Sequence, residues 1–129
     1  MTTHETARNV VPADDEWFDL KVGNDVKPVK IANLGYVSSL EVAEENADAM
    51  GYRLVGGQQV RDSFKARFPK PDDKGPVAFG GSQSQNPRGI ADVTYLSAFE
   101  GKWRSGFGWS GHVFGGYWRW LVTLKHLQT

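Results

Sequence analysis

The stretch that decides the fold is GKWRSGFGWSGHVFGGYWRW, residues 101–120, which places seven aromatic side chains and six glycines within twenty residues. Four of the five tryptophans of the chain lie in it. Aromatic rings bury large areas at little rotamer cost, and glycines let the backbone turn sharply between them. The stretch therefore predicts either the tightly turned centre of a β-rich core or a rigid aromatic surface that binds a partner.

The composition around this stretch restricts the class of protein. A chain of 129 residues fits one domain, and we expect a flexible lead-in over residues 1–15 and a single globular domain over residues 16–129. The absence of cysteine excludes disulfides, thiolate metal ligands and a cysteine nucleophile. Fifteen acidic and fifteen basic residues cancel, so no global field attracts nucleic acid or an anionic membrane.

The sequence also bears on where the protein acts. No apolar run approaches the roughly 20 residues of a membrane-spanning helix. The N-terminal residues have neither the basic region nor the apolar region of a signal peptide. We therefore expect a cytoplasmic or virion-associated protein without a signal peptide, of phage or bacterial origin.

Alternation of side chains is clearest after the aromatic stretch, over residues 117–127. One face of this predicted strand holds Trp118, Trp120, Val122 and Leu124, and the other holds Tyr117, Arg119, Thr123 and Lys125. Shorter extended segments are expected at 17–22, 29–34, 76–79 and 90–99. Polar, glycine- and proline-rich loops are expected at 69–76 and 80–89.

Two helices interrupt these strands. The first, over residues 39–50, has apolar residues at helical spacing, a capping box from Ser38 to Glu41 and a left-handed stop at Gly51. The second, over residues 58–68, repeats apolar residues every fourth position and ends before Pro69. The expected fold class is α+β, with two helices packed beside a short-stranded antiparallel sheet.

Between these helices the sequence GYRL, residues 51–54, resembles a family motif. C-type-lectin-like domains of the formylglycine-generating-enzyme branch, and retroelement variable proteins, carry a longer motif there that begins in the same way. This chain departs from it at Val55, Gly56 and Val60. The resemblance implies a C-type-lectin-like fold with ligand-binding residues on the aromatic, glycine-rich loops. It implies no oxidase activity, because the required cysteines are missing, and no calcium-dependent sugar binding.

These observations favour non-catalytic recognition through the surface of residues 101–119. Core positions are expected at Phe107, Phe114, Trp118 and Trp120. Tryptophans flanked by small and basic residues suit exposed anchors, since tryptophan, tyrosine and arginine are enriched at binding hot spots. The predicted ligand-binding residues are Trp103, Arg104, Trp109, His112, Tyr117 and Arg119. The partner would be a protein or a carbohydrate, and self-association through the same surface is also expected.

Two other classes of function remain open. A small enzyme could use His112 with a carboxylate such as Asp92 or Glu100. Nucleic-acid binding could use the basic residues interleaved with aromatics near Lys102. Because His4, His112 and His126 are scattered along the chain, we expect no metal site, and no motif indicates a cofactor.

Overall fold

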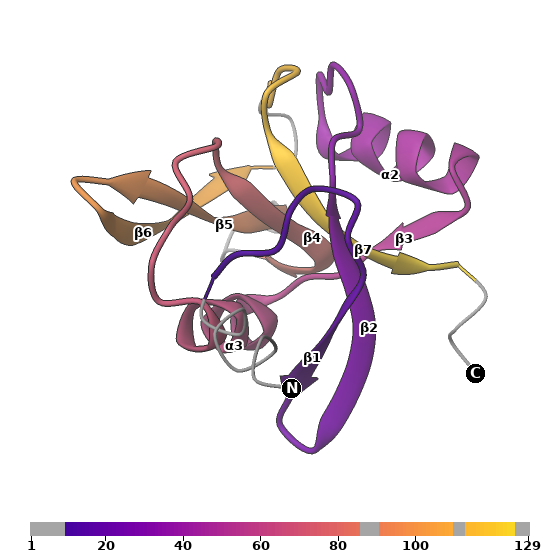
Figure 1. Ribbon diagram of the computed structural model, residues 1–129. Coiled ribbons are helices and arrows are strands. Elements are labelled where there is room, and N and C mark those ends of the chain that lie inside the picture. The colour runs from indigo at the N-terminus through magenta and orange to yellow at the C-terminus, as the bar shows by residue number, and fades with distance from the viewer. Residues whose placement is uncertain (1–9, 86–90, 110–112, 126–129) are drawn as a thin grey trace.

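The computed structural model describes residues 10–85, 91–109 and 113–125. In these residues two α-helices accompany a curled, mostly antiparallel sheet of seven strands, so the fold class is α+β as the sequence predicts (Figure 1). The elements along the chain are β1 (Phe18–Val22), β2 (Asp25–Ala32), α2 (Leu40–Ala49), β3 (Tyr52–Leu54), α3 (Gln58–Arg67), β4 (Val77–Gln85), β5 (Ala91–Phe99), β6 (Lys102–Trp109) and β7 (Arg119–Leu124).

Strand β7 lies at the centre of the sheet, whose order is β1-β2-β7-β4-β5-β6. It pairs antiparallel with β2 on one side, and on the other side with β4 in parallel and with β3 antiparallel. Both faces of β7 are covered: Leu121 belongs to one hydrophobic cluster, whereas Trp120 and Val122 belong to the other. A central strand of this curled sheet packs on both sides, so apolar residues lie on both faces of β7.

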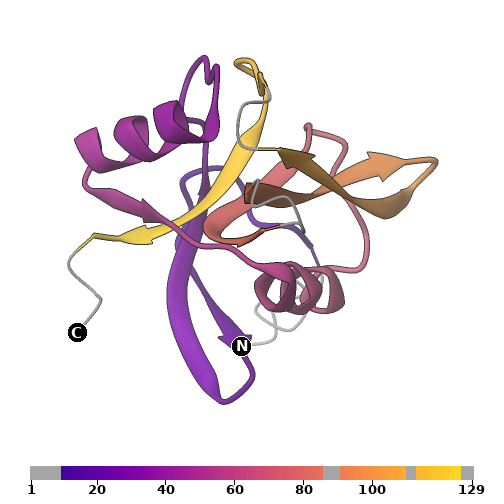
Figure 2. The same ribbon diagram turned by 180° about the vertical axis from the view of Figure 1, so that it is seen from behind.

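Each helix covers one of the two clusters, and Figures 1 and 2 show the helices at different ends of the sheet. Helix α3 inserts Phe64, whose ring packs against those of Phe68, Phe79 and Trp103 at centroid distances of 5.1, 5.5 and 6.2 Å. Helix α2 contributes the small residues Ala43 and Ala47. The aromatic residues that complete its cluster are Phe114, Trp118 and Trp120.

The helix boundaries follow the sequence closely, apart from one cap. The N-cap of α2 is Ser39, whose hydroxyl accepts a hydrogen bond from the Val42 N–H at 3.3 Å. The predicted capping box at Ser38 is thus displaced by one residue. Gly51 adopts the expected left-handed conformation with φ of 85°. Helix α3 ends at Arg67, two residues before Pro69.

The strands extend further than the sequence indicates. Residues 80–85, expected as a loop, continue β4 after an irregular register between Phe79 and Ser84. Residues 102–109 form β6, which pairs with β5 through a two-residue turn at Glu100 and Gly101, both with positive φ. Both departures have one cause, because glycine and serine lower strand propensity while pairing with a neighbouring strand overrides it.

The lead-in is attached to the sheet over its described part. Val11 is buried, and the Asp15 N–H donates to the Ile31 carbonyl at 2.8 Å. Residues 10–15 are thus held against the domain, unlike the loose segment expected there. Across the described ranges, neither helix has the length and apolar character needed to cross a membrane.

Candidate functional site

Trp103, expected as an exposed anchor, is part of the core. Its side chain is 7% exposed, and its indole N–H donates to the Phe68 carbonyl at 2.6 Å. This bond ties β6 to the end of α3 and satisfies the only polar group of the side chain. Trp103 therefore has no surface to offer a ligand, and the expectation of exposure is wrong. Its flanking Lys102 and Arg104 are exposed, since side chains alternate along a strand.

Arg119 is also buried, at 2% exposure. Its guanidinium donates to both carboxylate oxygens of Asp72 at 2.8 Å and to the Gly75 carbonyl at 2.7 Å. Asp14 lies 3.6 Å away. These contacts fasten the loop before β4, and the lead-in, to the central strand. Arg119 acts as a structural anchor and does not reach a ligand.

The contacts with Arg119 lower the pKa of the Asp72 carboxyl group. Burial raises its pKa, but the hydrogen bonds and positive charge of Arg119, together with the Lys74 backbone N–H, outweigh burial, so the pKa lies below its ordinary value. Asp72 therefore stays ionised as the partner of Arg119. A carboxylate held in that state is suited to an ion pair and unsuited to general acid catalysis near neutral pH.

The remaining predicted residues separate into two groups. Arg104 is exposed on β6, and its guanidinium lies 4.2 Å from the centroid of the Phe99 ring. The side chain of Trp109, that of Asp92 and the whole of His112 fall outside the described residues. The enzyme hypothesis based on His112 therefore stays a prediction. No group of three or more metal-ligating side chains occurs among the residues that the structure describes.

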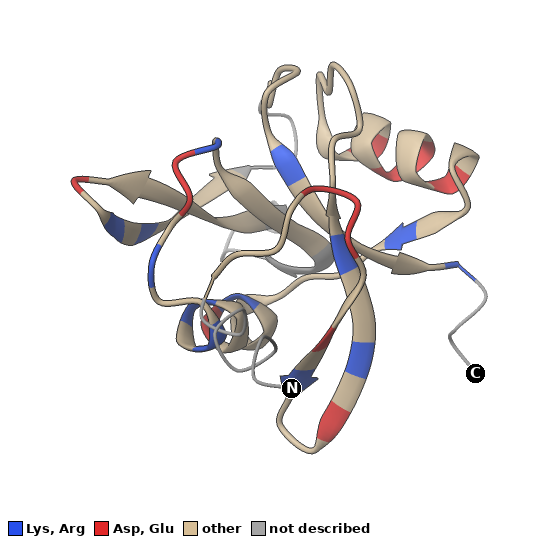
Figure 3. Ribbon diagram, viewed as in Figure 1, with Lys and Arg blue, Asp and Glu red and all other residues tan. Residues whose placement is uncertain are grey.

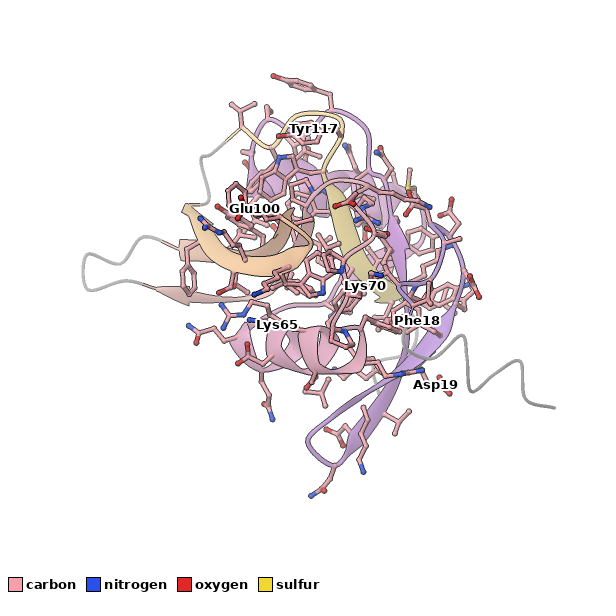
Figure 4. The ribbon with its side chains drawn as sticks, turned by 60° about the vertical axis from the view of Figure 1, so that its left-hand side comes forward. Phe18, Asp19, Lys65, Lys70, Glu100 and Tyr117 are labelled. Carbon is pink, nitrogen blue, oxygen red and sulfur yellow. The ribbon has the colours of Figure 1, made fainter. Side chains whose placement is uncertain are left out.

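Tyr117, like Arg104, is a predicted residue that lies on the surface, and it is 66% exposed. Figure 4 shows it at one end of the molecule, away from Lys65 on α3 and from Asp19 on β1. Tyr36, on the loop between β2 and α2, is also 66% exposed, and Val113 is 54% exposed. We call these three residues the tyrosine platform: Tyr36, Val113 and Tyr117.

The two loops that carry the platform are fixed to each other. Val37 and Gly115 form an isolated antiparallel bridge, with the Val37 N–H donating to the Gly115 carbonyl at 3.1 Å and the Gly115 N–H returning at 3.0 Å. The Asn33 side-chain amide donates to the Gly116 carbonyl at 3.0 Å. Beneath the platform, Val37 and Phe114 are buried. The exposed rings therefore stand on backbone that the core holds in place.

The ring of Tyr117 lies close to two glycines and to Trp118. A Cβ atom built on Gly115 would lie 3.8 Å from it, and one built on Gly75 would lie 3.6 Å from it. It also packs on Trp118, with ring centroids 6.5 Å apart. Glycines on both sides leave room for the ring close to the backbone. The ring of Tyr117 is thus largely exposed and contacts Trp118 on one side.

The platform is electrically neutral. Residues 33–39 and 113–118 include no charged side chain, and Figure 3 shows both loops without acidic or basic colouring. Sequence reasoning found Tyr117 but missed Tyr36, which lies 81 residues earlier in the chain. The signal that could have found it is a large aromatic residue directly after Gly35, in a short segment that fits neither a strand nor a helix.

A second surface feature, a hollow of about 250 Å³ beside α2, is lined chiefly by charged side chains. Two of these, Asp48 and Lys125, form an ion pair at 2.6 Å. An exposed pair of this kind contributes little energy and offers no reactive group. The platform is therefore the stronger candidate for function.

Comparisons of the chain with models of protein families, with curated protein sequences and with solved structures found no match. The lectin-like architecture suggested by GYRL accordingly stays a prediction, while the α+β class is shown by the elements themselves. The residues of the motif do have structural roles here. Gly51 ends α2, and residues 52–54 form β3 against β7.

Proposed function

We propose that this protein is a non-catalytic recognition protein that binds a protein partner through the tyrosine platform. The observation that carries the proposal is a pair of tyrosines, each 66% exposed, on two loops that the core fixes to each other. Tyrosine supplies a large amphipathic contact area with few rotatable bonds, which is why it is enriched at binding hot spots.

Preorganisation supports this proposal further. Binding costs free energy when side chains and loops must be ordered, and a surface that is already ordered avoids most of that cost. The bridge between Val37 and Gly115 and the packing of Tyr117 on Trp118 supply such order. A tyrosine ring that is mostly exposed adds little to the stability of the core. Stability alone is therefore a poor explanation for two such rings on ordered loops.

The lack of charge limits the class of partner. A neutral aromatic platform does not select acidic nucleic acid or phosphate groups, which require lysine or arginine. It suits an apolar or aromatic segment of a protein, with the tyrosine hydroxyls available for hydrogen bonds. A lectin-like recognition domain of phage or bacterial origin is the form of this proposal that GYRL favours.

The test uses a phage-displayed library of short peptides selected against the immobilised wild-type protein. The selected peptides are then measured against the Tyr117→Ala variant, the Tyr36→Ala variant and the matched control Phe99→Ala, whose ring is 49% exposed on β5 outside the platform. We expect each tyrosine variant to weaken binding about tenfold or more, and the control to leave it unchanged.

Two results would overturn the proposal. Peptides that bind equally well when both tyrosines are replaced would show that recognition occurs elsewhere on the chain. An oligosaccharide array that retains the wild type but not the double variant, with no selected peptide, would assign the platform to carbohydrate instead of protein.

A further inference from the structure

Strand β6 is an open edge of the sheet. It stands last in the strand order, and all eight of its residues pair in regular register with β5. No described residue pairs with its outer side. The opposite edge, β1, is covered, because Phe18 packs on the rings of Phe64 in α3 and of Phe68 just after it, and Arg67 donates to the Asp19 carbonyl at 3.0 Å. A long, regular, uncovered edge is a template for another strand.

The turn between β5 and β6 determines which backbone groups point outward. In a hairpin with a two-residue turn, the pair that flanks the turn is hydrogen-bonded, and pairs alternate from there. Phe99 and Lys102 flank this turn. Counting from them, the N–H and C=O groups of Trp103, Ser105 and Phe107 point away from β5 and are available to a further strand.

We propose that β6 pairs antiparallel with β6 of a second copy of this chain, about a two-fold axis at Ser105. In this register Ser105 faces itself, Trp103 faces Phe107, Arg104 faces Gly106 and Lys102 faces Gly108. Every outward N–H and C=O group named above finds a partner, which gives about six main-chain hydrogen bonds between the copies. The result is one continuous sheet across the dimer.

The side chains of β6 suit this register better than its neighbours. Like charges directly opposite each other destabilise a strand pair. With the axis at Ser105, both basic residues of β6 oppose glycines. An axis at Arg104 would place two guanidinium groups face to face, and an axis at Gly106 would move Lys102 beyond the end of the partner strand. The axis at Ser105 therefore keeps both basic residues within the paired region and opposite glycines of the second copy.

The dimer would also bring contacts to the aromatic rings of Phe107 and Tyr95. Phe107, expected in the core, is instead 52% exposed on the edge strand, with Arg61 lying 5.8 Å from its centroid as its charged neighbour. In the dimer Phe107 of each copy would lie on the face near α3, at the position opposite the buried Trp103 of the other copy. On the other face Tyr95 lies over Gly106, since a Cβ there would be 2.6 Å from its ring. Arg104 of the second copy would then meet that ring, a favourable cation–π contact.

The charges near the edge give the dimer a distinctive response to salt. Lys102 and Arg104 are exposed on β6, and the turn before them carries the acidic Glu100; Figure 3 shows basic and acidic colouring at this end of the β5–β6 hairpin. Two copies bring four such cations together, so screening by salt should strengthen the dimer. An acidic peptide added to the same edge would instead bind more weakly as salt rises.

The first test measures molar mass by light scattering as a function of protein and salt concentration. Wild type should form a dimer. Ser105→Arg, which places two cations opposite each other, should raise the dissociation constant at least about tenfold. Asn24→Arg, in the turn between β1 and β2, adds the same charge far from the edge and should leave the dimer unchanged. A wild type that stays monomeric at every concentration would overturn the proposal, and so would equal effects of the two variants.

The second test establishes the register. Because the chain has no cysteine, single cysteines can be introduced without background. Ser105→Cys should cross-link readily between copies with a short bis-maleimide. Lys102→Cys should not, because six residues of strand, about 20 Å, would separate position 102 from its copy. Cross-linking at position 102 in preference to 105 would contradict the proposed axis.

Discussion

At the residue scale, Arg119 connects two separate parts of the chain, the lead-in and the loop before β4, to the central strand. It is a member of the aromatic stretch, and its neighbours Trp118 and Trp120 are buried as well. Its charge is matched by Asp72 at 2.8 Å and by Asp14 at 3.6 Å. A buried charge is tolerated only when it is paired and hydrogen-bonded, so the loop before β4 is as much a part of the core as the strand is.

Replacing Arg119 should therefore destabilise the fold. Arg119→Met leaves Asp72 in a site where its carboxylate is only 14% exposed and has lost its cation. We expect a loss of about 3–5 kcal/mol in the free energy of unfolding, measured by urea titration. The control Arg53→Met removes an exposed arginine from β3 and should change that free energy by about 0.5 kcal/mol or less. Equal effects would show that Arg119 is not buried with its partner.

The ion pair also predicts a pH dependence. The folded-state pKa of Asp72 is depressed, so its contribution to stability is present above the unfolded pKa and is lost as pH falls through the folded one. The free energy of unfolding of wild type should thus decrease below about pH 4. Asp72→Asn lacks the titrating group, so its stability should be lower at neutral pH and should fall less on acidification. Parallel acid limbs for the two proteins would contradict this.

At the scale of elements, two adjacent serines at the start of α2 have different roles, because only Ser39 caps the helix. The hydroxyl of Ser39 bonds the Val42 N–H, whereas Ser38 is exposed. Ser39→Ala should lower the free energy of unfolding by about 1 kcal/mol, and Ser38→Ala should leave it nearly unchanged. Thermal unfolding followed by circular dichroism distinguishes them. The reverse order would restore the capping box expected from the sequence.

The β5–β6 hairpin contains a close contact that only glycine permits. A Cβ on Gly106 would lie 2.6 Å from the Cζ and Oη atoms of Tyr95. Gly106→Ala should destabilise the protein by about 1–3 kcal/mol, as overpacking does. The loss should shrink when Tyr95 is replaced by alanine, in a double-mutant cycle measured by urea unfolding. Additive losses would show that the ring does not cover Gly106.

Local patterns in the sequence predicted the elements whose signals are themselves local. Both helices were predicted within two residues at each end, because apolar spacing, Gly51 and Pro69 act within a single turn. Strands β4 and β6 were partly missed, because their glycines and serines are poor strand formers and only pairing with β5 makes them extended. The boundary of a strand depends on its neighbour, which a single segment does not reveal.

The same dependence on distant parts of the chain explains which residues of the candidate site were predicted correctly. Tyr117 was predicted from its aromatic surroundings. Trp103 was assigned to the surface because small and basic residues flank it, and Arg119 because it is a basic residue among aromatic ones. Their burial depends on partners that lie 35 and 47 residues away, Phe68 and Asp72. Tyr36 joins the platform only through the bridge between Val37 and Gly115. Long-range contacts of this kind are not encoded in any one window of the chain.

At the scale of the whole molecule, the aromatic stretch contributes both to the core and to the surface. Its tryptophans at 103, 118 and 120 join two clusters on either side of β7, while Tyr117 stands at the end of the molecule. The platform residues lie outside β6, so the dimer proposed through β6 does not pair any of them. Two platforms on one particle would bind a repetitive partner with higher avidity than a single one.

The most direct test of these assignments is hydroxyl-radical footprinting of the native protein, in which mass spectrometry gives the modification rate of each residue. Tyrosine and tryptophan react with similar intrinsic rates, so their relative modification reports exposure. We expect rapid modification of Tyr36 and Tyr117, each 66% exposed, and protection of Trp103, Trp118 and Trp120, each 7% exposed or less. Rapid modification of Trp103 with protection of the two tyrosines would contradict the division between core tryptophans and a tyrosine recognition surface.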